Sequence, residues 1–278
     1  MTTHARLAAL MTGSGWFVLT VLCLGAVLAS WLSPYDPAAQ DLTRTLMQPV
    51  WTDGGDWSHP LGTDALGRDY LSRLLHGGQV SIVVGILVAI VSGLIGTALG
   101  LLGGFVGGRV DAAVMFVITT RLSMPVVLVA LAVVSISGAS LTTAIMVLGL
   151  LFWDRFAIVT RATTLQLSTS EFVTAARAMG ASGAGIMLRE LLPNLRRPVV
   201  AIASIEMSHA ILVESALSFL GVGVQPPTAS WGGMIAEGRE LMTFLPHLVV
   251  LPGLTIFALV LSINLLAGRL ENDGEARQ

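Results

Sequence analysis

The chain has 278 residues, of which 54% are hydrophobic and only 12% are charged, whereas about 25% of an average soluble domain is charged. This composition predicts a membrane protein, and the formal net charge of −2 argues against a nucleic-acid surface, which requires a basic stripe. All fifteen basic residues are Arg, so the chain lacks the Lys of a phosphate-binding P-loop and cannot build a complete nucleotide-hydrolysing motif.

Six apolar stretches are long enough to cross a bilayer, since about 20 residues at 1.5 Å rise span a hydrocarbon core of about 30 Å. They are residues 16–32, 79–106, 112–136, 141–160, 198–220 and 244–267. We interpret the first as a retained anchor, because no small-x-small cleavage site follows it. It contains Cys23, the lone Cys, which excludes an internal disulfide and a Cys-rich metal site. The sequence therefore predicts an all-α polytopic protein with six transmembrane helices.

Small residues are frequent in the second span, where they permit close helix approach. They are Gly93, Gly96, Gly100, Gly103 and Gly104. We expect this seam to pack tightly against a neighbouring helix.

The distribution of Arg predicts the orientation of the spans. With both termini inside, the cytoplasmic segments hold Arg6, Arg109, Arg161, Arg177, Arg189, Arg196, Arg197, Arg269 and Arg277, and the outer segments hold Arg44, Arg68, Arg73 and Arg239. This excess on one side fits the positive-inside rule. Both termini and the segment around Gly180 are therefore expected in the cytoplasm.

The outer segment before the second span contains HPLGTDALGRDYLSRLLHGG, residues 59–78. Thr63 or Asp64 can cap a helix, Asp69 and Arg73 have the spacing of an i, i+4 ion pair, and Gly77 can end the helix. The pattern predicts a short amphipathic helix lying at the membrane interface.

A second polar stretch, EFVTAARAMGASGAGIMLRELLPN, covers residues 171–194. Helix formers precede Gly180, small residues follow it, and Pro193 is expected to stop a second helical run. The pattern predicts two short helices that meet at a glycine turn, with a small-residue surface that a partner groove can approach. A plain cytoplasmic connector is the alternative, although long ordered loops usually have a function.

Ionisable residues within the spans are functional candidates, because charge at mid-membrane costs several kcal/mol unless paired or hydrated. Arg121 and Glu206 fall at depths of about 15 and 13 Å from the expected cytoplasmic helix ends, and His209 lies one turn after Glu206. Either Arg121 and Glu206 pair, or these charges line a path that selects a charged solute. Glu214 is a candidate for gating or helix packing. Two ligands on one helix are too few for a metal site, and no catalytic residue is predicted.

Three motifs together resemble a known family. Thr174-Ala175-Ala176, Gly180 and Leu192-Pro193 resemble the Glu-Ala-Ala loop by which ABC importer permeases dock onto their ATPases. With HPLGTDALGRD and ESALSFLGVGVQPPTASWG (residues 214–232), the chain is similar to the second permease subunit of dipeptide, oligopeptide and nickel importers over about residues 36–267. Thr174 stands where that loop usually has Glu, and Glu190 where an apolar residue or His is common.

The resemblance implies a type I ABC importer permease fold in a bacterial inner (plasma) membrane. It divides the chain into an anchor and outer region (1–78), a permease domain (79–270) with a cytoplasmic coupling loop (161–197), and a short tail (271–278). The implied coupling residues are Glu171, Thr174, Ala175, Ala176, Arg177, Gly180, Ala181, Ser182, Ile186, Leu192 and Pro193.

The resemblance also implies partners. They are a second permease, two cytoplasmic ATPases that bind ATP and Mg²⁺, and a periplasmic or extracellular substrate-binding protein; this chain itself holds no cofactor. The alternative is an ion-coupled secondary transporter that acts without an ATPase, although the two halves show no inverted repeat. The substrate stays open among dipeptides, longer peptides, glutathione-like solutes and nickel.

Overall fold

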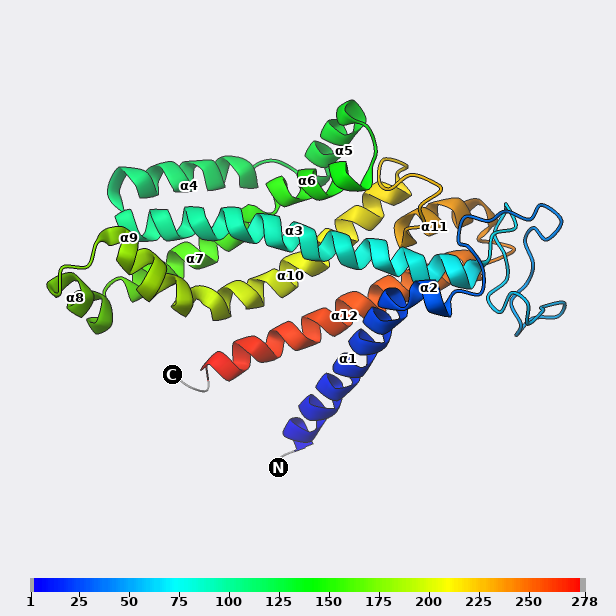
Figure 1. The fold of residues 1–278 in the computed structure, drawn as a ribbon, viewed down its shortest axis with the longest axis horizontal. Coiled ribbons are helices and arrows are strands. Elements are labelled where there is room, and N and C mark those ends of the chain that lie inside the picture. Colours follow the sequence, from blue (N-terminus) through cyan, green and yellow to red (C-terminus); the bar gives the residue numbers. More distant parts are fainter. Residues whose placement is uncertain (1–2, 276–278) are drawn as a thin grey trace. The chain divides into compact units, whose positions relative to one another are not determined.

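The computed structural model describes the backbone of residues 3–275 and the side chains of residues 13–268. Within this part the regular elements are helices, and the only strand-like pairing is an isolated bridge between Thr63 and Asp69 (Figure 1). The predicted all-α class is confirmed. The last three residues of the predicted tail, 276–278, lie outside the described residues.

Four helical segments are long and apolar enough to cross a membrane: Tyr70–Val106, Leu141–Leu167, Gly183–Phe219 and His247–Gly268. A fifth span results if Gly108–Leu122 and Val126–Ser137, which are bent by 81° at their junction, are counted as one. The described part of the first helix, Gly13–Val27, is apolar but shorter. The multi-pass architecture is confirmed, and the number six stays a prediction.

The chain divides into two compact units. The first combines the residues up to Gly85 with Leu131–Ala144 and Ile211–Leu266. The second combines Ile86–Ala130 with Ile145–Ala210 and the residues from Ala267 onward. Three long helices, α3 (Tyr70–Val106), α10 (Leu192–Phe219) and α12 (His247–Glu275), contribute residues to both units.

The first unit contains α1 (Thr3–Val27), α2 (Ala29–Leu32), most of α5 (Val126–Ser137), α11 (Trp231–Gly238) and the 3₁₀ turn η2 (Arg239–Leu241). Residues 33–69 between α2 and α3 form turns rather than a helix. In these turns the Asp64 carboxylate accepts hydrogen bonds from the backbone N–H groups of Leu66 and Arg68. Such local bonds compete with helix formation.

The prediction of a separate interfacial helix within residues 59–78 is therefore wrong. Helix α3 begins at Tyr70 and continues without a break to Val106, so Gly77 does not end it. Gly77 instead lies against Trp231, where an added Cβ would come within 2.9 Å of the indole ring. The Trp231 Nε1–H also donates to the carbonyl of Leu74 at 2.8 Å. The glycine serves close packing inside a continuous helix.

The second unit packs the later part of α3 against α4 (Gly108–Leu122) and α7 (Trp153–Leu167), which follows α6 (Leu141–Leu151). The predicted glycine seam is confirmed here. A Cβ on Gly96, Gly100 or Gly104 would overlap the backbone carbonyls of α7. Close approach of this kind is the means by which membrane helices gain van der Waals contact.

The stretch after α7 forms α8 (Glu171–Ala178), a turn at Gly180 with φ of 82°, α9 (Gly183–Gly185) and the π-helical turn η1 (Ile186–Leu191). The glycine turn agrees with the prediction. The expected stop at Pro193 is wrong, because the helix continues into α10 and ends at Phe219. The wider π turn just before Pro193 fits a residue that donates no hydrogen bond and clashes with a regular α-helical carbonyl.

Candidate functional site

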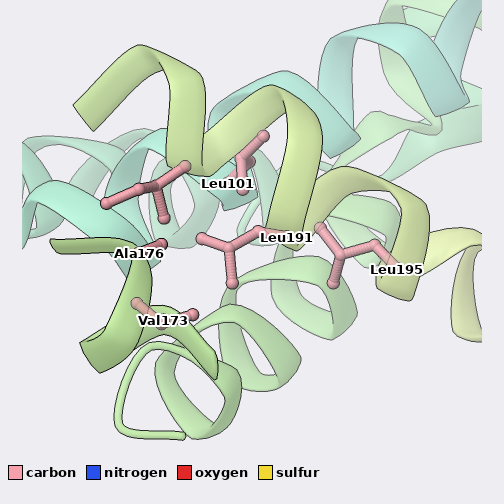
Figure 2. Close-up of a cluster of buried hydrophobic side chains, with 6 residues drawn as sticks. Leu101, Val173, Ala176, Leu191 and Leu195 are labelled. Atoms are coloured by element: carbon pink, nitrogen blue, oxygen red, sulfur yellow. The ribbon is translucent and has the colours of Figure 1, made fainter. Parts of the chain in front are cut away.

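The segment of residues 171–191, called here the Gly180 segment, is held by six buried apolar side chains. This apolar cluster consists of Leu101, Val173, Ala176, Ile186, Leu191 and Leu195. Figure 2 shows Val173 and Ala176 of α8 in one cluster with Leu191 of η1, Leu195 of α10 and Leu101 of α3. Val173 and Ala176 are three residues apart, so both fall on one face of α8. The packing fixes α8 on the second unit.

The opposite face of the Gly180 segment is exposed and consists mainly of small side chains. Of the predicted coupling residues, Ala176 and Ile186 are buried in the apolar cluster. The others are exposed: Glu171, Thr174, Ala175, Arg177, Gly180, Ala181, Ser182, Leu192 and Pro193. Met179, which the sequence interpretation did not single out, is 82% exposed at the end of α8. Small side chains on this face leave its backbone open to close approach.

Two polar contacts order the Gly180 segment further. The Ser182 hydroxyl accepts a hydrogen bond from the N–H of Gly185 at 3.2 Å and so caps the helix that follows the turn. The Arg177 guanidinium lies 5.5 Å from the centre of the Phe105 ring of α3, within the range of a cation–π contact. The Thr174 hydroxyl donates to the carbonyl of Ser170 at 3.1 Å, at the start of its own helix.

The pair of Arg121 with Glu206, one of the two sequence interpretations, does not form. Arg121 instead lies 3.4 Å from the Asp154 carboxylate and donates to the carbonyl of Leu151. Both partners are buried, with side chains 10% and 4% exposed. The correction has a structural cause, because α7 places Asp154 in its first turn at the position that Arg121 of α4 faces.

Glu206 pairs with a residue that the sequence interpretation missed. Arg155 donates from Nη1 to Glu206 Oε1 at 3.1 Å and to His209 Nδ1 at 2.9 Å. Asp154 and Arg155 sit together in the predicted fourth span, and two adjacent charges within an apolar stretch were the signal that could have found them. Of the predicted path residues, Arg121 thus lies in a buried pair with Asp154, whereas Glu206 and His209 belong to a partly exposed group with Arg155.

Glu214 lies fully buried in the part of α10 that belongs to the first unit. Its Oε1 accepts a hydrogen bond from the Ser218 hydroxyl at 2.7 Å, and Ser218 also accepts one from the backbone N–H of Val224 at 3.2 Å. Gly223 sits so close to Ser218 that a side chain there would overlap it. Glu214 therefore contributes to the turn that follows α10, which fits the packing role among its two predicted roles.

Four charged side chains of the first unit form a second group, called here the ion-pair cluster: Asp64, Arg68, Arg73 and Glu237. The first three are buried, and the Glu237 side chain is 35% exposed. Arg68 lies 2.7 Å from Asp64 and 2.8 Å from Glu237 of α11. Arg73 contacts the same two carboxylates, at 2.6 Å to Glu237. The predicted Asp69–Arg73 side-chain pair is wrong, because Asp69 accepts from the Ser72 hydroxyl at 2.6 Å and faces His59 instead.

The ion-pair cluster fixes the HPLGTDALGRD turns to α11. The Tyr70 hydroxyl adds a hydrogen bond to the carbonyl of Leu248 in α12. Among the described residues no group of three His, Cys, Asp or Glu side chains could hold a metal ion. The polar side chains of HPLGTDALGRD thus anchor these turns to α11 and α12.

The fold and these surfaces define a multi-pass helical membrane component. Residues 96–273, more than half of the chain, match the family of binding-protein-dependent transport system inner membrane components, and the chain belongs to this family. It is 42% identical over 256 residues to the dipeptide transport system permease protein DppC of Escherichia coli K12, covering 92% of this chain and 85% of that protein.

Two further relatives carry other substrate names. The chain is 38% identical over 257 residues to the di/tripeptide transport system permease protein DppC of Pseudomonas aeruginosa UCBPP-PA14, covering 92% of this chain and 84% of that protein. It is 37% identical over 262 residues to the glutathione transport system permease protein GsiD of Shigella flexneri serotype 5b, covering 94% and 84%. The chain is a transport subunit of the ABC importer type, and the ion-coupled alternative is not supported.

Proposed function

We propose that the chain is one of two different permease subunits of an ATP-driven peptide importer. The relatives named for dipeptides, di- and tripeptides and glutathione support a small peptide as the substrate. A periplasmic or extracellular binding protein delivers the peptide, and two cytoplasmic ATPases supply the driving force. Nickel, which the motif resemblance left open, is the competing substrate.

The Gly180 segment is the proposed contact with the ATPases. Its support is the combination of a face anchored by the apolar cluster and an exposed face of small side chains around Met179. ATPase closure would push on this segment and move it as a lever, because Val173 and Ala176 tie it to α3 and α10. Alternating access then follows as a two-state rearrangement of packed helices.

The proposed topology has six spans and both termini in the cytoplasm. The Arg excess of the expected inner segments supports it, as does the bent pair Gly108–Leu122 and Val126–Ser137 counted as one span together with the first apolar helix. This orientation puts the Gly180 segment on the ATPase side.

The contact is tested by Met179→Arg in the importer purified through its ATPase subunit. We expect this permease to be lost from the purified complex. In the proposed contact the Met179 side chain packs against apolar groups of the ATPase, and an Arg would place an unpaired charge there. The matched control is Leu42→Arg, which changes an exposed apolar residue, 71% exposed, in the turns before α3. Equal recovery of both variants would contradict the proposed contact.

The substrate is tested by ATP-dependent uptake into membrane vesicles that contain the binding protein and the complete importer. Radiolabelled dialanine, glutathione and Ni²⁺ are compared at equal concentrations. We expect uptake of a peptide and none of Ni²⁺, with inhibition by vanadate. Uptake that follows an ion gradient without ATP would overturn the proposal.

A further inference from the structure

Arg155 exposes a cation in the middle of a membrane segment. Its side chain is 49% exposed, and it lies near the centre of Leu141–Leu167. Its Nη1 donates to Glu206 and His209. Among the described residues no partner is found for Nε and Nη2, the edge of the guanidinium that binds a carboxylate with two parallel hydrogen bonds.

The two partners of Arg155 differ in what they leave available. Glu206 is fully buried, and its Oε2 has no hydrogen-bond partner among the described residues. His209 accepts from Arg155 at Nδ1, so its neutral ring carries the proton on Nε2, and its side chain is 37% exposed. The group therefore presents donors outward, from Arg155 and His209, and keeps its one carboxylate inside.

The neighbouring pair shows that this exposure is specific to Arg155. Asp154 precedes Arg155 in the chain, yet both Asp154 and its partner Arg121 are buried. Because both side chains of this pair are buried, they cannot meet a solute. The same turn of α7 thus separates an internal pair from an accessible cation.

A half-exposed guanidinium at this depth cannot face hydrocarbon without a large cost in free energy, and snorkelling to the interface works only near helix ends. Intramembrane charges accordingly face the interior of a bundle or a water-filled cavity. In a permease that works beside a second permease, the surface that carries Arg155 is therefore turned toward the path between them.

We infer that Arg155, Glu206 and His209 form a site in the translocation path for the free carboxylate end of the passing peptide. The inference rests on the proposed peptide import and names the chemistry of one contact within it. Arg155 offers the Nε/Nη2 edge to the carboxylate, and the His209 Nε2–H adds a donor. Glu206 holds the guanidinium in place and partly neutralises it, which keeps binding weak enough for release, as conduction requires.

The site is tested by thiol labelling in membranes that hold the complete importer. Cys23, the lone Cys of the chain, is replaced by Ser, and Cys is introduced by Ile158→Cys, three residues after Arg155 on the same face of α7. The probes are a sulfonate and a trimethylammonium methanethiosulfonate of similar size. We expect the anionic reagent to react about tenfold faster than the cationic one, and this preference to fall to about one in Arg155→Gln.

Peptide protection tests the carboxylate. Dialanine present during labelling should slow the reaction at Ile158→Cys, and dialanine amide, which lacks the carboxylate, should protect about tenfold less, the effect expected for loss of a charge-assisted bond. Arg155→Lys keeps the positive charge but not the planar pair of N–H donors. It should therefore retain the preference for the anionic reagent and lose most of the protection by dialanine. Phe116→Cys, an exposed position of α4, serves as the control that peptide should not affect.

Three results would overturn the inference. One is no reaction with either reagent at Ile158→Cys, because the surface would then lack water. Another is a reaction that occurs only in the isolated permease and is blocked in the complete importer whether or not peptide is present, because Arg155 would then contact the second permease. The third is equal protection by dialanine and its amide. Peptide-stimulated ATP hydrolysis in the same membranes tests the proposed function separately, since the reagent preference is measured without peptide.

Discussion

The ion-pair cluster and the apolar cluster anchor two irregular segments by opposite means. Charged side chains fix the turns before α3, with Arg73 2% exposed between two carboxylates. The Gly180 segment rests on six apolar side chains and no ion pair within its core. Ionic bonds are directional and costly to break one at a time, whereas apolar contacts are non-directional. The first device favours a fixed shape, and the second permits a segment to move with the helices beneath it.

The largest effect is expected from Arg73→Leu. Removal of this guanidinium leaves Asp64 and Glu237 with Arg68 as their remaining ion-pair partner in the cluster. Breaking a buried ion pair lowers the free energy of unfolding by about 3–5 kcal/mol. The measurement is the apparent melting temperature of the purified complex. Arg44→Leu is the control, since Arg44 and Asp41 form an exposed pair at 3.6 Å, worth about 0–1 kcal/mol. A similar shift for both variants would show that burial does not distinguish the two ion pairs.

Leu191→Ala is expected to have the second-largest effect. The side chain is fully buried in the apolar cluster, and a Leu-to-Ala change in a core costs about 2–5 kcal/mol. Because the cavity loosens α8 from α10, uptake should fall further than ATP hydrolysis. Both rates are measured in the same vesicles. Leu94→Ala, at a side chain of α3 that is 69% exposed and lies outside the Gly180 segment, should leave their ratio unchanged, and a parallel loss in both variants would argue against a lever.

Local chemistry in the sequence predicted some of these features well. The small residues of the second span predicted its close packing, and the position of Gly180 predicted the turn between two helices, since each depends on the residue itself. Long-range partners could not be predicted in the same way. Asp64 pairs with Arg73 and Arg68 joins Glu237, which lies 169 residues away in the chain, so spacing along one helix gave the wrong partner for Arg73.

The candidate path shows the same division. The sequence identified Arg121, Glu206 and His209 as unusual within the spans but could not tell which helix faces each one. Depth alone allowed Arg121 and Glu206 to meet, whereas Asp154 and Arg155 take those partners. Pro193 was also misinterpreted from the sequence, as the end of a helix. The π turn before it accommodates the missing hydrogen bond of the proline, which a regular α-helix cannot.

Gly180→Ala is expected to have an intermediate effect on the Gly180 segment. An added Cβ meets no atom within 4 Å, but the residue has a φ of 82°, and a left-handed conformation costs an L-residue about 1–2 kcal/mol. The change tests backbone strain without altering contacts. Gly183→Ala is the matched control, since its Cβ only reaches ordinary contact with Phe105. We expect weaker recovery of the ATPase with Gly180→Ala alone.

The smallest effect is expected from Arg177→Gln, which removes the cation that lies over Phe105 beside the apolar cluster. Arg177 lies over Phe105 at 5.5 Å, and an exposed cation–π contact contributes about 0.5–1 kcal/mol. A double-mutant cycle with Phe105→Leu, measured as shifts in melting temperature, isolates this contact from any interaction of Arg177 with an ATPase, because the cycle retains only the coupling between the two residues. A coupling near zero would leave the Gly180 segment held by apolar packing alone. A coupling above about 2 kcal/mol would mean that this segment, like the turns before α3, depends on a charge.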